Sequence, residues 1–444
     1  MNTNKIFYIL VGLIAIVIFI TIILVLRGMG GSSGQPVNLE FWGVFDDSEA
    51  FTGAIRGYQQ SQQSQKSNVK IFYRRFSYED YERSLIDALA AGTGPDIFMV
   101  GNAWLPKHGD KLKPLPAQIK GLKAPLFTLS SFKDQFVEVA YNDLVSGGQI
   151  YALPLYADTL ALYYNKDMFN SAGITRPPTD WEEFNDDIGL LTKLDSAGNI
   201  VQSGAAMGTA KNINRSTDIL MALMLQSGVK MTDSDNASAT FANAVSGLTV
   251  GETALKYYTD FANPRVSTYA WNDSRHYSID AFAQGEVAMM FNYAHQASIL
   301  KAKAPRLNFG VAPMPQISSS DIKNYANYWA VGVSNASKQS DDAWKFIAYL
   351  ASREGATAYL NASQRPAARR DLIDLQRTDI DLGLFAVQAL TAKSWYQIDQ
   401  VTIEGIFADM IDNVNFGRYS VREALSKAES KVTVLMSQKR RSQQ

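Results

Sequence analysis

Apolar and polar positions along the first part of the chain follow a pattern that predicts strands separated by helices. Residues 37–45 and 69–76 have the composition of strands, and residues 96–100, DIFMV, are predicted to form a short buried strand. Between them, residues 48–60 and 77–92 carry apolar side chains at helical spacing. Strand, helix, strand, helix, strand in this order predicts a parallel α/β sheet with right-handed crossovers.

Both kinds of element continue through the rest of the chain. In the segment TDWE, Thr179 is predicted to cap a helix and Glu182 to reach back to the cap as a capping box. Further elements that the pattern predicts are helices at 217–226, 340–352 and 420–436 and strands at 287–291 and 327–334.

One uncharged segment is too long and too apolar for a globular core element. Residues 6–26 would span a hydrocarbon core of ~30 Å at ~1.5 Å per residue, and no cleavage site is evident. We therefore expect a single-pass anchor over residues 1–27, followed by a Gly/Ser linker at 28–36. Residues 28–55 carry no Lys or Arg, so the positive-inside rule favours a globular body on the extracellular side of the cell membrane.

Composition limits the classes of protein that remain. A chain of 444 residues predicts two or more domains, and a formal net charge of −1 argues against a nucleic-acid binder. The chain has no cysteine, which excludes disulfides, thiolate catalysis and lipid attachment through an N-terminal cysteine.

Cofactor and metal chemistry have no sequence support. The three histidines, His108, His276 and His295, are far apart in sequence, which argues against a histidine metal site. Residues 232–238 begin like a calcium loop but lack its glycine and its terminal glutamate. There is no phosphate loop, so we expect no metal, no cofactor and no binding of ATP by this chain itself.

Four segments in a characteristic order resemble a known family. They are GTGPDIFMV, YALPLYADTLALYYNKDMFNSAGITRPPTDWEEF, AFAQGEVAMMF and AVGVSNASKQSDDAWKFIAYL. Over roughly residues 37–436 the chain resembles the extracellular solute-binding proteins of ABC transporters, and most of all the carbohydrate-binding group that includes maltose-binding protein. The resemblance implies a two-lobed α/β periplasmic-binding-protein-like (type II) fold, with ligand held between the lobes.

The resemblance also implies where the chain passes from one lobe to the other. The crossings are expected near 156–159, 328–330 and 370. The first lobe then comprises residues 37–156 plus 329–370, and the second lobe comprises residues 157–328 plus 371–444.

A single carboxylate, Asp158, interrupts the apolar strand at residues 151–166. Without a partner in a core it would be costly, or it would be protonated. If it lies at the first crossing, it faces the cleft, stays ionised and accepts hydrogen bonds from ligand hydroxyls. The alternative is a salt bridge to an Arg or Lys of the other lobe.

Sugars require aromatic faces and polar groups, which converge at the carboxyl ends of strands in open α/β sheets. The ligand-binding candidates are Trp42, Asp46, Asp47, Asn102, Trp104, Tyr156, Asp158, Asn214, Arg215, Trp271, Asn292, Tyr293, His295, Tyr328, Trp329, Trp395 and Tyr396. The ordinary structural alternatives are helix capping for Asp46 and Asp47, a turn for Asn214 and core packing for the aromatic residues. Trp181 and Trp344 lie on amphipathic helices and are assigned to the core.

These features together predict a membrane-anchored receptor that captures a sugar or oligosaccharide by hinge closure and passes it to ABC permease subunits. Two alternatives use the same fold. One is an enzyme acting on surface polysaccharide with a carboxylate pair such as Asp46 and Asp158. The other is a sensor subunit that reports ligand occupancy to a membrane kinase.

Overall fold

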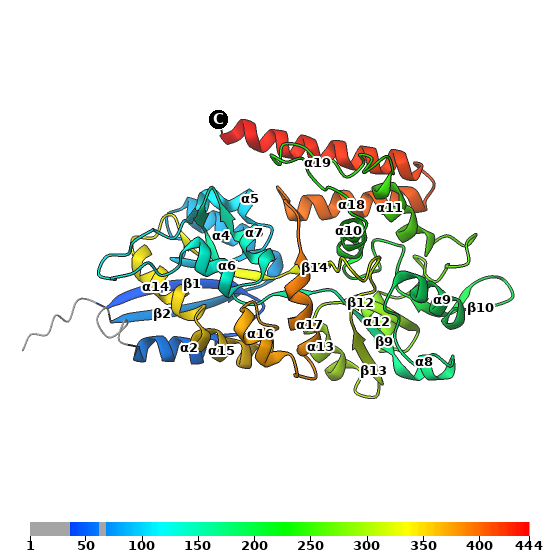
Figure 1. Cartoon of the computed structure of the whole chain (residues 1–444), viewed down its shortest axis with the longest axis horizontal. Helices are drawn as coiled ribbons and strands as arrows, with labels where there is room; N and C mark the ends of the chain where they lie inside the picture. The colour runs from blue at the N-terminus through cyan, green and yellow to red at the C-terminus, as the bar shows by residue number, and fades with distance from the viewer. Residues whose placement is uncertain (1–35, 62–67, 444) are drawn as a thin grey trace, which may run out of the picture.

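The computed structural model describes residues 36–61 and 68–443, and they fold into two α/β lobes side by side (Figure 1). In the first lobe, β1 runs parallel to both β2 and β3, as the strand–helix–strand pattern predicts. The later strands β15 and β7 add antiparallel pairs, so the sheet is mixed. Its order is β2-β1-β3-β15-β4, with β7 beside β15. The strands are β1 (Val37–Val44), β2 (Val69–Phe76), β3 (Ile97–Gly101), β4 (Leu112–Lys113), β7 (Ala152–Pro154) and β15 (Trp329–Ser334).

Helices of the first lobe bury one face against this sheet. In α2 the apolar positions Ala50, Phe51, Ala54 and Tyr58 recur at helical spacing and are buried. Ser77 caps α4 by accepting from the Asp80 amide. The helices here are α2 (Ser48–Gln60), α4 (Tyr78–Ala90), α5 (Leu105–His108), α6 (Leu129–Gln135), α7 (Glu138–Leu144), α14 (Ser340–Leu350), α15 (Arg353–Ser363) and α16 (Arg370–Gln376). A short hairpin joins β5 (Val145–Ser146) to β6 (Gln149–Ile150), and a 3-10 turn spans Gly109–Lys111.

The second lobe has its own sheet, in the order β10-β11-β12-β9-β13. Strand β12 is parallel to β11 and antiparallel to β9. The helix α10 is apolar almost all round because it packs inside the lobe. The strands are β9 (Ala161–Asn165), β10 (Lys193–Leu194), β11 (Ile200–Ala205), β12 (Val287–Asn292) and β13 (Phe309–Ala312). The helices are α8 (Lys166–Ser171), α9 (Trp181–Leu191), α10 (Ser216–Gln226), α11 (Val250–Asp260), α12 (Ser278–Ala283), α13 (His295–Lys303), α18 (Gln400–Asn415) and α19 (Val421–Gln443).

The cap of α9 differs from the prediction by one residue. Asp180, not Thr179, accepts from the backbone amide of the third helical residue, Glu183, at 2.8 Å. Glu183, not Glu182, reaches back and accepts from the Thr179 amide at 2.9 Å. An aspartate caps at least as well as a threonine, so the segment TDWE offered two neighbouring caps. A capping box is also present at the start of α19, between Ser420 and Glu423.

A small sheet between the lobes forms the hinge. Strand β14 (Asn324–Asn327) pairs with β8 (Asp158–Thr159) on one side and with β16 (Ala392–Lys393) on the other. Helix α17 (Gly383–Gln388) and a 3-10 turn at Ala389–Thr391 lead into β16. Each lobe thus has its own core, and the hinge connects them.

The residues that make up each core can be compared with the predicted lobe boundaries. Leu372 and Ile373 pack into the first core, although the boundary expected at residue 370 assigns them to the second lobe. The residues Trp181 and Trp344 are buried in the cores of the second and first lobes, respectively, as expected. The lobe boundaries themselves stay a prediction.

Helix α19 reaches from the second lobe towards the first (Figure 1). Its first turns pack on α11 and α18, and near its end Lys439 Nζ donates to the backbone carbonyl of Lys107 in α5 at 3.1 Å. Lys107 also forms an ion pair across the lobes with Asp399, at 2.8 Å. Both contacts tie the second lobe to the first.

The predicted membrane anchor and linker lie outside the described residues, apart from Pro36. Within residues 36–61 and 68–443, no helix combines the length and the apolarity that a membrane crossing requires.

Candidate functional site

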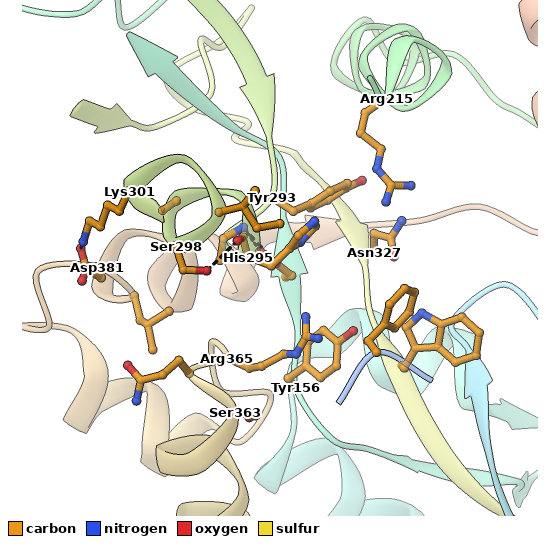
Figure 2. Close-up of a pocket in the computed structure, with 18 residues that line it drawn as sticks. Tyr156, Arg215, Tyr293, His295, Ser298, Lys301, Asn327, Ser363, Arg365 and Asp381 are labelled. Carbon is orange, nitrogen blue, oxygen red and sulfur yellow. Dashed lines mark hydrogen bonds and ion pairs between the residues drawn. The ribbon is translucent and has the colours of Figure 1, made fainter. Parts of the chain in front are cut away.

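A cavity of about 540 Å³ lies between the two lobes beside the hinge strands (Figure 2). Its size is typical of small-molecule sites. Six of the predicted binding residues line it, namely Tyr156, Asp158, Arg215, Tyr293, His295 and Trp329. They come from four separate segments of the chain, so the fold assembles this site from distant parts of the sequence.

Backbone strain concentrates at this cavity. Phe45, Arg215 and Gln364 have φ values of 64°, 64° and 52°, in the left-handed region that side-chain-bearing residues rarely adopt. All three line the cavity. Strained backbone persists where the surrounding structure enforces it, and it is common at ligand sites.

Aromatic rings form the wall contributed by the first lobe. The rings of Phe45 and Trp329 meet edge to face, with centroids 5.6 Å apart. Trp329 packs in turn on Trp104, at 5.1 Å between centroids. Phe45 is 44% exposed, which leaves a large apolar ring open to the cavity. Such surfaces suit the apolar faces of a ligand.

Arg365 contributes a cation to the floor of the cavity, and Asp46 holds it from behind. The Asp46 carboxylate accepts from Arg365 Nη2 at 2.8 Å and from the Tyr359 hydroxyl at 2.7 Å. The guanidinium lies 4.6 Å from the ring centroid of Tyr156. Asp46 itself is buried and does not line the cavity, so its role is to position Arg365.

Asp158 lies at the cavity wall in the hinge strand β8, but its carboxylate is already engaged. The Ala294 amide at the start of α13 donates to both of its oxygens, at 3.2 and 3.0 Å. Burial raises the pKa of this carboxyl to about 7, although these amide bonds and the two nearby arginines oppose the shift. With a pKa of about 7, this carboxyl exchanges its proton near neutral pH, and its role as an ionised ligand-binding group stays a prediction.

We expect Asp158→Asn to remove part of the pH dependence of stability. The folded-state pKa lies above the unfolded value, so the native carboxyl binds a proton more tightly and wild-type stability falls as pH rises from about 4 to 7. At pH 8 the variant should be more stable than wild type by a few kcal/mol, since one pKa unit corresponds to ~1.4 kcal/mol. At pH 4 the difference should vanish.

Urea denaturation of the ligand-free protein at both pH values measures this difference. Other buried carboxyls, such as Asp143 and Glu404, also have raised pKa values and titrate in both proteins. Their contributions therefore cancel when wild type and variant are compared. A variant equally destabilised at both pH values would show that Asp158 acts only through its hydrogen bonds.

His295 and Tyr293 form the wall contributed by the second lobe. Their rings are stacked, with centroids 6.4 Å apart and planes inclined by 15°. Burial, together with the charges of Arg365 and Arg215, lowers the pKa of His295 to about 3. His295 is therefore neutral at physiological pH and offers one ring donor or acceptor rather than a charge.

Comparison with known proteins decides the family. The model of the bacterial extracellular solute-binding protein family matches residues 47–357, which is more than half of the chain. The chain belongs to this family. Membership places the solute-binding protein outside the cytoplasm, in an extracellular or periplasmic location.

Relatives and solved structures agree with this assignment. A Brucella abortus protein named only as a binding protein is 25% identical over 367 residues, covering 80% of this chain and 82% of its own. The cyclic alpha-maltosyl-1,6-maltose binding protein of Arthrobacter globiformis has a TM-score of 0.74 at 22% identity, covering 91% of this chain and 100% of that chain. The sugar-binding protein MalE of Xanthomonas citri has a TM-score of 0.74 at 19% identity, covering 91% and 98%. At these identities the likenesses establish the two-lobed fold.

Several predicted binding residues of the solute-binding protein belong to its cores instead. Trp271 is fully buried, and its Nε1 donates to Asn212 at 3.1 Å. Trp42 packs beneath Phe76, at 4.5 Å between ring centroids. Trp104 lies behind Trp329 rather than in the cavity. Their large apolar surfaces gain more from packing than from exposure in a loop.

Polar candidates outside the cavity have ordinary structural partners. The exposed Asp47 pairs with Arg75 at 2.6 Å. Asn292 donates to Asn214 at 3.0 Å, and Asn214 donates to the Tyr277 hydroxyl at 2.8 Å. These amides fix the loop that leads into α10, and thereby the position of Arg215.

A second hollow, of about 520 Å³, holds the remaining predicted residues near the hinge. Asn102, Trp395 and Tyr396 line it. Beside them, buried Asp143 accepts from Asn102 at 3.3 Å and from the Tyr328 hydroxyl at 2.7 Å. Tyr328 is fully buried and does not line the main cavity. This group therefore supports the hinge and is separate from the main cavity.

Some lining residues escaped the sequence analysis. Arg365 and Gln364 follow helix α15 and reach the cavity from the first lobe, and Asn327 reaches it from hinge strand β14. Proximity to an expected crossing was the only available signal for Asn327, which immediately precedes the predicted crossing at 328–330. Arg365, just before Pro366, had a similar signal from the crossing expected near residue 370.

No group of three or more His, Cys, Asp or Glu side chains in the described part of the chain is arranged to hold a metal ion.

Proposed function

We propose that this solute-binding protein captures a sugar or oligosaccharide between its lobes and delivers it to the permease subunits of an ABC importer. The observation that carries the proposal is the make-up of the cavity beside the hinge. It combines the exposed ring of Phe45 and the largely buried ring of Trp329 with the polar groups of Arg365, Asn327 and His295. Flat rings and convergent hydrogen-bonding groups match the two kinds of surface on a sugar.

Binding is proposed to act through hinge closure. A ligand in the cavity would touch Trp329 of the first lobe and His295 of the second at the same time. Contacts made by both lobes exist only when the lobes are together, so the ligand shifts the population towards the closed state. The ion pair of Lys107 with Asp399, at 2.8 Å, also joins the two lobes.

The permease would recognise the closed surface formed by both lobes. The anchor predicted at residues 6–26 belongs to the same proposal and would keep the receptor at the membrane, close to its permease. We also propose that the protein binds its ligand without converting it chemically. Of the carboxylate pair that an enzyme would need, Asp46 is bound to Arg365 and does not line the cavity.

Isothermal titration calorimetry against saccharides, polyols, amino acids and short peptides tests the proposal. We expect at least one saccharide to bind in the micromolar range or tighter and the non-sugar compounds not to bind. Binding of peptides or amino acids alone, or binding of nothing in the panel, would contradict a sugar receptor.

For the saccharide that binds, Trp329→Ala should weaken affinity by about 30-fold. Loss of a buried aromatic contact at the centre of a binding site typically costs about 2 kcal/mol, which corresponds to this factor. Phe416→Ala is the control for loss of an aromatic side chain away from the cavity, because Phe416 is 52% exposed and does not line it. Equal affinities of the two variants would argue against stacking on Trp329, provided that circular dichroism shows both to be folded.

A further inference from the structure

Arg215 differs from the other cations that line the main cavity. Arg365 pairs with Asp46 at 2.8 Å, and Lys301 pairs with Asp381 at 2.7 Å. Arg215 makes no ion pair with any residue in the described ranges. Its Nε is shielded from solvent and has no hydrogen-bond partner.

The backbone aims this guanidinium at the cavity. Arg215 occupies the cap position before α10, with φ at 64°, and its side chain reaches away from the helix towards Tyr293 and Asn327 (Figure 2). The centre of the guanidinium lies 5.4 Å from the Tyr293 ring centroid. The positive end of the α10 helix dipole lies beside it, so both features favour a negative charge at this position.

Against the opposing effect of burial, Asp218 and Glu404 stabilise the charge of Arg215 from a distance, which raises its pKa, but neither forms an ion pair with it and each is hydrogen-bonded to another side chain. Asp218 accepts from the Tyr293 hydroxyl at 2.8 Å, and Glu404 accepts from Gln400 at 3.0 Å. Asp158 is engaged by the Ala294 amide. Burial raises the pKa values of Asp218, Glu404 and Asp158, which weakens all three as counter-charges. The Nε donor of the half-buried Arg215 is shielded from water without a partner, which is costly unless a ligand fills it.

We propose that the captured saccharide is acidic and that its carboxylate or phosphate group binds the guanidinium of Arg215. A guanidinium matches both groups through two parallel N–H···O bonds, which a neutral hydroxyl cannot reproduce. The inference rests on the proposed function and specifies its substrate class. Arg365 and the aromatic wall then hold the neutral part of the same ligand.

Calorimetry with matched pairs tests this inference on the whole protein. Each neutral sugar is compared with its uronic acid and with its phosphate ester, for example galactose with galacturonate and with galactose 6-phosphate, and likewise for disaccharides. We expect one acidic form to bind about 10- to 150-fold more tightly than its neutral twin, the range that hydrogen bonds to charged groups provide. Whether the uronate or the phosphate is preferred identifies the anionic group.

The variant Arg215→Gln should reduce this preference, the ratio of the acidic to the neutral affinity, to about onefold. Lys211→Gln is the matched control, because Lys211 lies on the same loop, is exposed and pairs with Asp412 outside the cavity. It should keep the wild-type preference. Thermal unfolding verifies that both variants are folded.

The possible outcomes separate the two proposals. Neutral sugars that bind as tightly as acidic ones overturn the acidic ligand and leave the sugar receptor intact. A preference that survives in Arg215→Gln overturns the role of Arg215. If neither neutral nor acidic saccharides bind, the proposed function itself fails.

Discussion

Replacing Asp46 with alanine should destabilise the first lobe by about 3–5 kcal/mol, the cost of breaking a buried ion pair from one side. The Asp46 side chain is 8% exposed and accepts hydrogen bonds from Arg365 and Tyr359 at 2.7–3.2 Å. Its removal leaves the guanidinium and the hydroxyl without a partner in a largely buried place. Arg365 also loses its anchor beside the cavity, so ligand affinity should fall as well. Urea denaturation followed by circular dichroism measures the loss of stability.

The adjacent residue provides the control. Asp47 also pairs with an arginine, Arg75, at the short distance of 2.6 Å, but both side chains are more than half exposed. Asp47→Ala should therefore change stability by less than about 1 kcal/mol. Similar losses for the two variants would mean that burial does not decide the strength of these pairs.

Replacing Trp271 with alanine should also destabilise the protein by about 3–5 kcal/mol, here through the second lobe. The indole is fully buried, and its Nε1 donates to Asn212, which itself donates to the carbonyls of Asn272 and Arg275. The substitution removes a large apolar volume and one hydrogen bond of this network. Denaturation at a fixed pH measures the effect.

Ligand affinity distinguishes this structural role from a binding role. Trp271 does not line the cavity, so the folded fraction of Trp271→Ala should keep wild-type affinity. Leu248→Ala, at a site that is 66% exposed, should change neither property. A loss of ligand affinity above about tenfold in folded Trp271→Ala would show that Trp271 contributes to ligand binding.

The regular elements of the fold were predictable because they depend on local patterns. The strand at Val37–Val44 and the helix at Ser48–Gln60 follow from apolar periodicity, and the structure confirms both. The mixed character of the first sheet was not predictable in this way. Strand β15 pairs with β3 although Trp329 and its partner Gly101 are more than 220 positions apart, and periodicity does not specify such a partner.

The site was predictable only in part, because a sequence shows which side chains are suitable but not which way they face. Tyr156, Arg215 and His295 line the cavity, whereas Trp271 and Tyr328 are equally suitable in kind and are buried in packing. Asp46 illustrates a different limit. Its partner Arg365 lies more than 300 positions away, so neither residue reveals the pair on its own.

The position of the C-terminal helix α19 matters for the design of biosensors from this protein. Helix α19 has 23 residues and is therefore a rigid rod about 34 Å long, fixed to one lobe and touching the other through Lys439. A fluorescent reporter fused to the end of α19 would lie beside the other lobe, so its surroundings would change when the lobes move relative to each other. The same fusion would hinder that movement if it were bulky or attached to a sensor chip. Immobilisation is therefore better placed elsewhere, and the helix end is suited to an optical readout of occupancy.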